Sequence, residues 1–386
     1  MWALCPWLSR ERKTGGNGRG EALSPRGLRG LVGHLRTNVA FAAVAIASVF
    51  LSGAVLSGYL STAPTGFALR LGYFPNVTHA QALYGIATGA YERALHQALG
   101  MDFSIQPHAF NAGPAAITAL LSNHVDMVFV GPSPTLNGLS VAPDILRVIA
   151  GASSGGALFV VQPYVNLTTD AGYGGKKFAT PQWGNTQDIA LRHYLLTKGH
   201  RTLDQGGDVD IINVANAEIL TLFKLGRIDG AWVPEPWGTR LIKEANGKAI
   251  LDERTLWLET NGEFVSTQLV TTKRYREQHP DVITAFLRAY VNVTLLLQRE
   301  KKSDLEIING EFKNLTTSSL DEDIIADAFG NMNVTYDPIA PSLRTYLAWT
   351  QDLEFLSRDV RLDSLYDLTL LNQILEEKGL PPVTGL

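Results

Sequence analysis

From Phe67 onward, short apolar runs alternate with amphipathic stretches along the chain. The runs ALRLGYF (68–74), FSIQPHAF (103–110) and VDMVFVG (125–131) predict strands, and the stretches 79–95 and 111–122 predict the helices between them. In the second helix, Asn111 is the candidate N-cap and Pro114 fits the first turn. The run 125–131 lacks polar alternation, as expected for a parallel strand that is covered on both faces.

The same unit then occurs a second time. Strands are predicted at 176–181, 209–214 and 228–233, and helices at 186–197 and 217–225. The third strands match at one constant offset, which pairs Asp126 with Asp229 and Phe129 with Trp232. Earlier in the unit, Thr78 matches Thr186. Helices that alternate with buried strands give an open parallel sheet, so two copies predict two Rossmann-like α/β lobes.

The remaining segments predict how the two lobes are connected. Residues 146–162 leave the first copy, residues 264–272 form an isolated β-rich run, and helical patterns follow at 280–298, 303–313, 321–329, 342–356 and 365–378. The simplest path enters lobe one, crosses to lobe two and returns, so that two crossings form a hinge beside a ligand groove. The predicted domains are a basic tail at 1–36, a signal or anchor at 37–63, lobe one at 64–158, lobe two at 159–264, and the return with C-terminal helices at 265–386.

The N-terminal segment predicts export. Residues 1–36 are rich in arginine, and residues 39–60 carry no charge over a length of about 20 residues that can cross a bilayer. Basic residues before such a segment predict a cytoplasmic N-terminus, which places the rest in the periplasm or on the outer face of the cytoplasmic membrane. An uncleaved membrane anchor and a signal peptide with a long basic region both remain open.

Composition and motifs narrow the function classes. The net charge of −4 gives no basic field for nucleic acid, and the single cysteine, Cys5, permits neither an internal disulfide nor a thiolate metal cluster. The eight histidines show no ligand spacing, and the phosphate-loop, dinucleotide, zinc-protease and serine-hydrolase motifs are absent. The sequence therefore predicts a monomeric protein that is not an enzyme and needs no metal and no cofactor.

The candidate chemistry lies in the turns after the predicted strands. Most of these turns lead into helix N-termini, whose free N–H groups and dipoles favour an anion. They contain hydroxyls and amides but no Lys or Arg, and His79 is the one possible cation. Such neutral turns suit a small, weakly basic anion such as a sulfonate or nitrate. Glu235 is interpreted as a helix cap in preference to an acceptor for an ammonium group, and Trp232 as a core residue.

Four motifs in order resemble the nitrate, sulfonate and taurine group of solute-binding proteins of bacterial ABC transporters: GYFPNVTHAQALYG, FNAGPAAITALLSNHVDMVFVGPSPTLN, ATPQWGNTQDIALRHYL and GRIDGAWVPEPWGTRL. The resemblance implies a type II periplasmic-binding-protein fold, a small anion gripped between two lobes, and partnership with a membrane permease and its ATPase. By motif match, the implied ligand-binding residues are Asn76, Thr78, His79, Gly113, Pro114, Ser133, Gln182, Asn185, Thr186, Glu235 and Trp237.

Several alternatives stay open. Within the transport receptor, an aliphatic sulfonate, taurine included, ranks before nitrate or bicarbonate. A thiamine-pyrimidine-related binding protein or enzyme on the same fold is the second class, although that enzyme group uses a cysteine-rich motif and this chain has only Cys5. A membrane-tethered sensor that binds the same ligand is the third.

Overall fold

The computed structural model describes residues 67–100, 103–299 and 301–386. The predicted basic tail at 1–36 and the apolar segment at 39–60 lie outside these residues. Among the described residues, one helix, α10 (Pro280–Leu297), has the length and apolar composition of a membrane span. Most of α10 is buried inside the protein, with Phe286 and Tyr290 fully covered, so α10 is a core helix.

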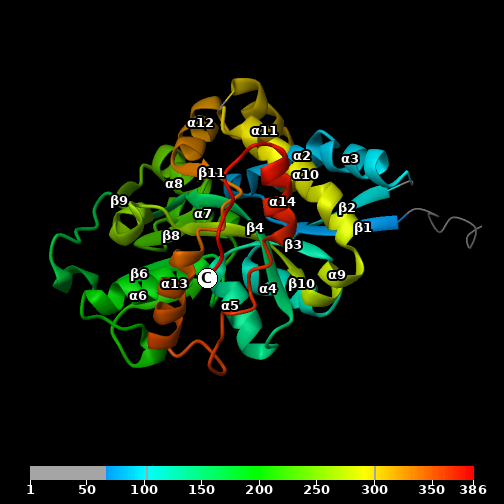
Figure 1. Ribbon diagram of the computed structural model, residues 1–386. Helices are drawn as coiled ribbons and strands as arrows, with labels where there is room; N and C mark the ends of the chain where they lie inside the picture. Colours follow the sequence, from blue (N-terminus) through cyan, green and yellow to red (C-terminus); the bar gives the residue numbers. More distant parts are fainter. Residues whose placement is uncertain (1–66, 101–102, 300) are drawn as a thin grey trace, which may run out of the picture. The chain divides into compact units, whose positions relative to one another are not determined.

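The first sheet has six strands in the order β11-β4-β10-β3-β1-β2 (Figure 1). These strands are β1 (Phe67–Tyr73), β2 (Phe103–Ala109), β3 (Met127–Val130), β4 (Leu146–Gly155), β10 (Val265–Thr272) and β11 (Met332–Val334). β1 pairs in parallel with β2 and β3, whereas β10 is antiparallel to both β3 and β4. The chain thus returns to the first sheet through β10 after it has built the second one.

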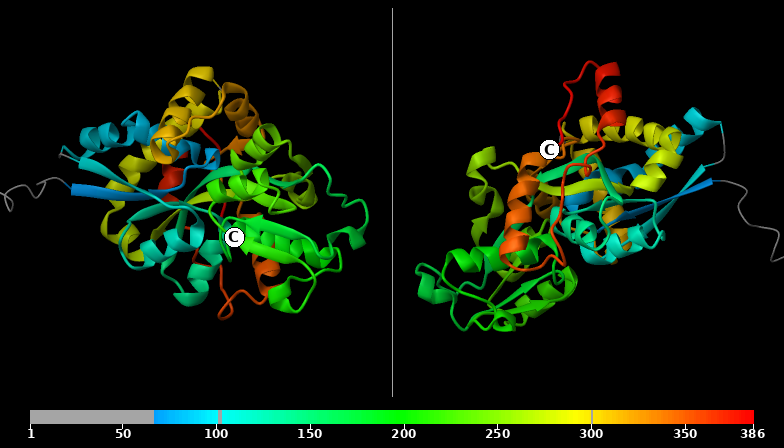
Figure 2. Two further views of the ribbon diagram at one scale, coloured as in Figure 1. Left: turned by 180° about the vertical axis from the view of Figure 1, so that it is seen from behind. Right: turned by 60° about the horizontal axis from the view of Figure 1, so that its bottom comes forward.

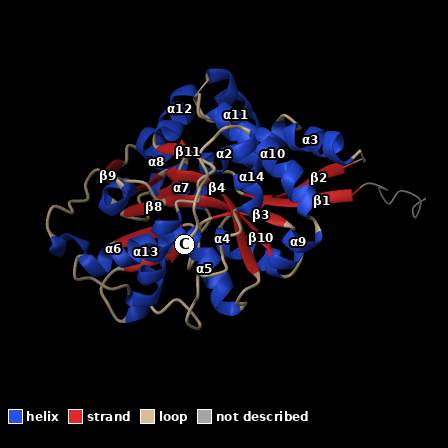
Figure 3. Ribbon diagram, in the orientation of Figure 1, coloured by secondary structure: helices blue, strands red, loops and turns tan. Residues whose placement is uncertain are grey.

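The second sheet has five strands in the order β7-β6-β8-β5-β9. These strands are β5 (Ala157–Val161), β6 (Lys177–Thr180), β7 (Asp210–Asn213), β8 (Gly230–Pro234) and β9 (Lys248–Asp252). β6 pairs in parallel with β7 and β8, and β5 is antiparallel to β8. Both sheets therefore share one order, in which the first parallel strand lies between the second and the third, and an antiparallel strand follows the third. The predicted α/β class with two sheets is confirmed (Figure 3).

The duplication extends to hydrogen bonds. The carboxylate Oδ2 of Asp126 accepts the backbone N–H of Arg70 at 2.8 Å, and the Oδ2 of Asp229 accepts the backbone N–H of Lys177 at 2.8 Å. In each copy, the aspartate that precedes the third strand is therefore bonded to the first strand. The pairing of Asp126 with Asp229, predicted from the repeat, reflects one structural role that occurs twice.

The helices cover the sheets on both faces (Figure 3). Besides α10 they are α2 (Ala80–Ala87), α3 (Ala90–Leu99), α4 (Gly113–Leu121), α5 (Pro132–Val141), α6 (Thr186–Thr197), α7 (Asn216–Lys224), α8 (Trp237–Ala245), α9 (Lys273–Gln278), α11 (Lys302–Thr316), α12 (Glu322–Gly330), α13 (Ala340–Asp352) and α14 (Thr369–Glu377).

Two helix predictions need correction. The predicted helix 79–95 is broken into a short 3-10 turn at Val77–His79, then α2 and α3, because Gly89 adopts a left-handed φ of 64° between the two helices. Asn111 is not the N-cap of α4, because that position is Ala112 and no side chain caps the helix. Pro114 does lie in the first turn of α4, as predicted.

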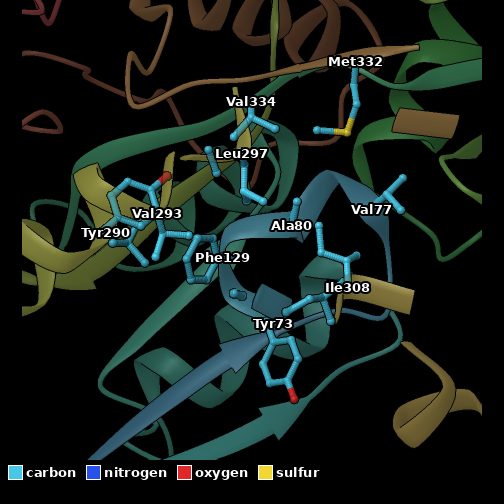
Figure 4. Close-up of a cluster of buried hydrophobic side chains, with 14 of the residues drawn as sticks. Tyr73, Val77, Ala80, Phe129, Tyr290, Val293, Leu297, Ile308, Met332 and Val334 are labelled. Carbon is cyan, nitrogen blue, oxygen red and sulfur yellow. The ribbon is translucent and has the colours of Figure 1, made fainter. Parts of the chain in front are cut away.

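The core of the first sheet forms where α2, α10 and α11 pack over the strands. Figure 4 shows Tyr73 of β1, Phe129 of β3 and Tyr290 of α10 among these side chains. In the second sheet, Trp232 is fully buried and stacks on Phe159 with ring centroids 5.4 Å apart. The interpretation of Trp232 as a core residue is therefore confirmed.

The chain crosses between the sheets at Gly155 and Gly156, which join β4 to β5. Both have a φ of 74°, in the left-handed region that glycine adopts without steric cost. The return crossing precedes β10. Helix α13, orange in Figure 2, packs against α5, which follows β3, and against α6, which follows β6. The division of the chain at 64–158, 159–264 and 265–386 remains a prediction.

A buried glutamate joins α13 to the second sheet. Glu253 follows β9 and is fully buried, and its carboxylate accepts Trp232 Nε1–H at 2.9 Å and the Tyr346 hydroxyl at 2.7 Å. Burial raises the pKa of Glu253 from 4.5 to about 7. Between these two values the folded protein holds a proton that the unfolded chain has released. The free energy of unfolding therefore falls as the pH rises through this window.

Replacing Glu253 with glutamine should flatten that fall. The amide keeps an oxygen for Trp232 and an N–H for the Tyr346 oxygen, but it does not titrate. Urea unfolding at pH 4.5 and pH 7 would measure the slope, with Glu259→Gln, which removes an exposed carboxylate, as the matched control. An unchanged slope in Glu253→Gln would contradict a protonated Glu253 in the folded protein.

Candidate functional site

A cavity of about 20 Å³ lies where elements of the two sheets meet. Its polar walls come from segments that follow strands of the first sheet, from segments that follow strands of the second, and from β10. The polar lining residues are Asn76, Thr78, His79, Asn111, Asn185, Thr186, Gln187, Asn216, Ser266 and Thr267. A cavity of this size holds about one water molecule, so a larger ligand requires the two walls to separate.

Four helices begin at this cavity. Ala112 and Gly131 line it directly before α4 and α5 of the first copy, and Thr186 and Asn216 line it as the first residues of α6 and α7 of the second copy. Each helix N-terminus carries about half a positive charge and several free N–H donors. The four termini come from both copies of the repeat, so both walls of the cavity favour an anion.

Three buried polar atoms at these helix starts have no hydrogen-bond partner. They are Ser133 Oγ, Thr186 Oγ1 and Asn216 Oδ1, in side chains that are 0%, 1% and 7% exposed. An unpaired buried polar group costs about 1–3 kcal/mol, and a bound ligand, ion or ordered water that pairs with it removes that cost. The Ser133 and Thr186 hydroxyls can donate to an anion, which fits the preference of the helix termini, whereas Asn216 Oδ1 can only accept.

His79, the one possible cation among the predicted turns, is neutral in this conformation. Complete burial lowers the pKa of His79 to about 3. Its Nδ1 accepts the backbone N–H of Phe74 at 3.3 Å, so the neutral ring carries its proton on Nε2. His79 therefore offers the cavity a neutral N–H donor.

Hydrogen bonds connect the two copies of the repeat at Asn76, Glu235 and Trp237. Trp237 Nε1–H donates to Asn76 Oδ1 at 3.0 Å, and the Val77 N–H donates to the Glu235 carbonyl at 3.1 Å. Asn331, just before β11, donates from Nδ2 to Glu235 Oε1 at 2.7 Å. These bonds connect the segment after β1 with the start of α8, which follows β8 of the second sheet.

Glu235 caps α8, as interpreted from the sequence. Its carboxylate accepts the N–H of Thr239 at 2.9 Å and the Thr239 hydroxyl at 2.9 Å. Burial raises the pKa of Glu235 to about 7. All of these bonds are internal to the protein, and Glu235 does not line the cavity.

The predicted site residues fall into two groups. Asn76, Thr78, His79, Asn185 and Thr186 line the cavity. Six others lie outside its lining: Gly113, Pro114, Ser133, Gln182, Glu235 and Trp237. Gly113 packs tightly under Pro134, where an added Cβ would lie 2.3 Å from the proline ring. Ligand contact by any of the eleven remains a prediction.

The sequence reasoning missed Asn216, Ser266 and Thr267. Asn216 follows the strand predicted at 209–214, and its position is equivalent to the break after the strand at 103–110. That position was a detectable signal, although the turn contains neither Gly nor Pro. Ser266 and Thr267 belong to β10, and no pattern in the sequence marks them.

Charge is absent from the cavity lining. None of the lining residues is Asp, Glu, Lys or Arg, and His79 is neutral. Within the described residues, no group of three or more His, Cys, Asp or Glu side chains has the arrangement of a metal site. The arrangement can hold a small anion through neutral donors and helix dipoles.

Comparison with known proteins agrees with this geometry. The model of the NMT1-like family matches residues 62–308. The chain belongs to the NMT1-like family. Its relatives include the taurine-binding periplasmic protein of Escherichia coli (strain K12), which is 27% identical over 190 residues, or 47% of this chain and 54% of that protein. The match thus spans about half the length of that relative.

Solved structures show the same fold. The periplasmic nitrate-binding protein of Synechocystis PCC 6803 superposes with a TM-score of 0.67 at 16% identity, covering 83% of this chain and 91% of the other. The alkanesulfonate-binding protein of Xanthomonas axonopodis pv. citri bound to MOPS gives a TM-score of 0.62 at 16% identity, covering 76% and 95%. The predicted periplasmic-binding-protein fold is confirmed, as is the resemblance to nitrate-, sulfonate- and taurine-binding proteins.

Proposed function

We propose that this NMT1-like protein is the extracytoplasmic substrate-binding component of an ABC importer. It captures a small anion between its two lobes and delivers it to a permease that a separate ATPase drives. Taurine-, nitrate- and alkanesulfonate-binding proteins among its relatives and structural neighbours support this class. In this proposal the N-terminal segment directs export or anchors the protein on the outer face of the membrane.

One observation carries the proposal. Four helix N-termini, two from each copy of the repeat, begin at one cavity without any charged side chain, and the Thr186 hydroxyl there is buried without a partner. Neutral donors hold an anion without a full salt bridge, so that the anion is released when the walls separate. That property suits a transport receptor, which must give up what it binds.

An aliphatic sulfonate is the first candidate ligand. The apolar lining residues Phe74, Ala112, Pro181 and Pro234 offer contact to a short alkyl chain, while the helix termini face the sulfonate oxygens. Nitrate is the second candidate, and the small volume of the cavity favours it.

Replacing Ser133 and Thr186 together with alanine tests the proposed walls. Each removes a buried hydroxyl that has no partner within the protein, so the free energy of unfolding should not fall. Binding of ethanesulfonate should weaken at least about tenfold, since one hydrogen bond to a charged group contributes about 1.5–3 kcal/mol. Isothermal titration calorimetry measures the affinity.

The matched control is Thr118→Ala with Ser122→Ala, which removes the same two residue types from α4 and from the residue directly after it. Both hydroxyls there bond to the carbonyls of their own helix at an exposed site. The control should bind as the unaltered protein does. Equal affinity in the two double variants would show that the cavity is not the ligand site.

A further inference from the structure

The electrostatics of the cavity bear on which anions it accepts. We infer that this site selects anions that carry no ammonium group, an inference that rests on the proposed function. It takes an alkanesulfonate or a nitrate-like anion and discriminates against zwitterions such as taurine. The first ground is that an ammonium group inside the cavity meets the positive ends of α4, α5, α6 and α7 and no carboxylate in the lining.

The second ground is that the buried carboxylates beside the lining residues are already engaged. Glu235 follows the lining residue Pro234, but its oxygens accept from Thr239 and Asn331. Freeing Glu235 for a ligand would leave the N-terminus of α8 without its cap and Asn331 without its acceptor.

Asp188 is engaged in the same way. It follows the lining residue Gln187, and its carboxylate accepts from Thr180, the Gly184 N–H, Asn213 and Arg192. The Arg192 guanidinium already neutralises its charge at 3.1 Å. Neither carboxylate is therefore available to an ammonium group.

The third ground is desolvation. Moving an ammonium group from water into a buried site without a counter-charge is costly, and a site gains specificity by withholding that partner. A sulfonate without an amino group carries no such cost, because its alkyl end meets Phe74, Ala112 and the prolines. Taurine and ethanesulfonate differ only by the amino group, so they isolate this effect.

The test measures ethanesulfonate, taurine and nitrate by calorimetry on the full-length protein in non-ionic detergent. Tris chloride replaces the common sulfonate-containing buffers, which would compete for the site. We expect ethanesulfonate to bind at least tenfold more tightly than taurine. Taurine binding as tightly as ethanesulfonate, or more tightly, overturns this inference while the proposed function stands. Failure of all three anions to bind overturns the proposed function and the inference with it.

A gain-of-specificity variant checks the mechanism. Asn216→Asp places a carboxylate in the lining at the N-terminus of α7, where a negative charge is compatible with folding. The ratio of taurine affinity to ethanesulfonate affinity should rise at least tenfold. Asn292→Asp makes the same change at an exposed position on α10 and should leave the ratio unchanged. An unchanged ratio in a folded Asn216→Asp protein contradicts the inference.

Discussion

Replacing Gly131 with leucine should lower the affinity for ethanesulfonate about a hundredfold, or about 2.7 kcal/mol. Gly131 lines the cavity before α5, and a Cβ built there would lie 2.3 Å from Thr186 Oγ1 on the opposite wall. A leucine side chain would hold the walls apart or fill the space between them. The φ of Gly131 is −75°, which any residue adopts, so the substitution strains no backbone.

Calorimetry on Gly131→Leu measures the loss, and thermal unfolding without ligand checks the fold. Gly310→Leu is the control, because a Cβ on Gly310 of α11 meets nothing within 4 Å. Affinity within a factor of three of the unaltered protein would show that the walls do not close on the ligand at Gly131.

Replacing Asp188 with alanine should destabilise the protein by about 3–5 kcal/mol. Asp188 is fully buried, and its carboxylate accepts Arg192 Nε–H at 3.1 Å, Thr180 Oγ1–H at 2.9 Å and the Gly184 N–H at 2.9 Å. Its loss leaves the buried Arg192 guanidinium without its buried counter-charge and frees the turn that leads into α6. Urea unfolding measures the change in the free energy of unfolding.

Asp204→Ala is the matched control for Asp188→Ala. Asp204 also accepts from Arg192, at 2.9 Å, but its side chain is 54% exposed. Exposed ion pairs contribute about 1 kcal/mol or less, so this variant should lose no more than that. Equal losses in the two variants would contradict the larger contribution assigned to the buried network.

The repeat in the sequence predicts most of the fold because apolar runs that mark strands and amphipathic stretches that mark helices occur in the same order in both copies. Apolar runs without alternation mark buried parallel strands, and helix α6 has the predicted bounds of 186–197. The hydrophobic pattern gives no bounds for α5 and α8, because the segments GPSP and PEPW at their starts favour turns by composition. In the structure, Pro132 of GPSP nevertheless lies in the first turn of α5. Gly89 divides a periodic stretch that otherwise suits one helix.

The site was less predictable for a physical reason. Polar turns after strands identify Asn76, Thr78, His79, Asn185 and Thr186, because strand ends meet at one edge of a sheet. Contacts between distant segments leave no local signal. The bond from Asn331 to Glu235 and the lining by Ser266 and Thr267 are of this kind. The lowered pKa of His79 could not be predicted either, because it results from burial by residues that are distant in the sequence.

A thermal-unfolding screen of the full-length protein tests the central claim most directly, namely that the cavity between the two copies binds a small anion. The panel contains ethanesulfonate, longer alkanesulfonates, taurine, nitrate and bicarbonate in sulfonate-free buffer. A ligand at a hundredfold excess over its dissociation constant adds about 2.7 kcal/mol to the free energy of unfolding. The account predicts a rise in the unfolding temperature with an alkanesulfonate or nitrate that Gly131→Leu abolishes. No rise with any anion of the panel, or an equal rise in Gly131→Leu, would contradict it.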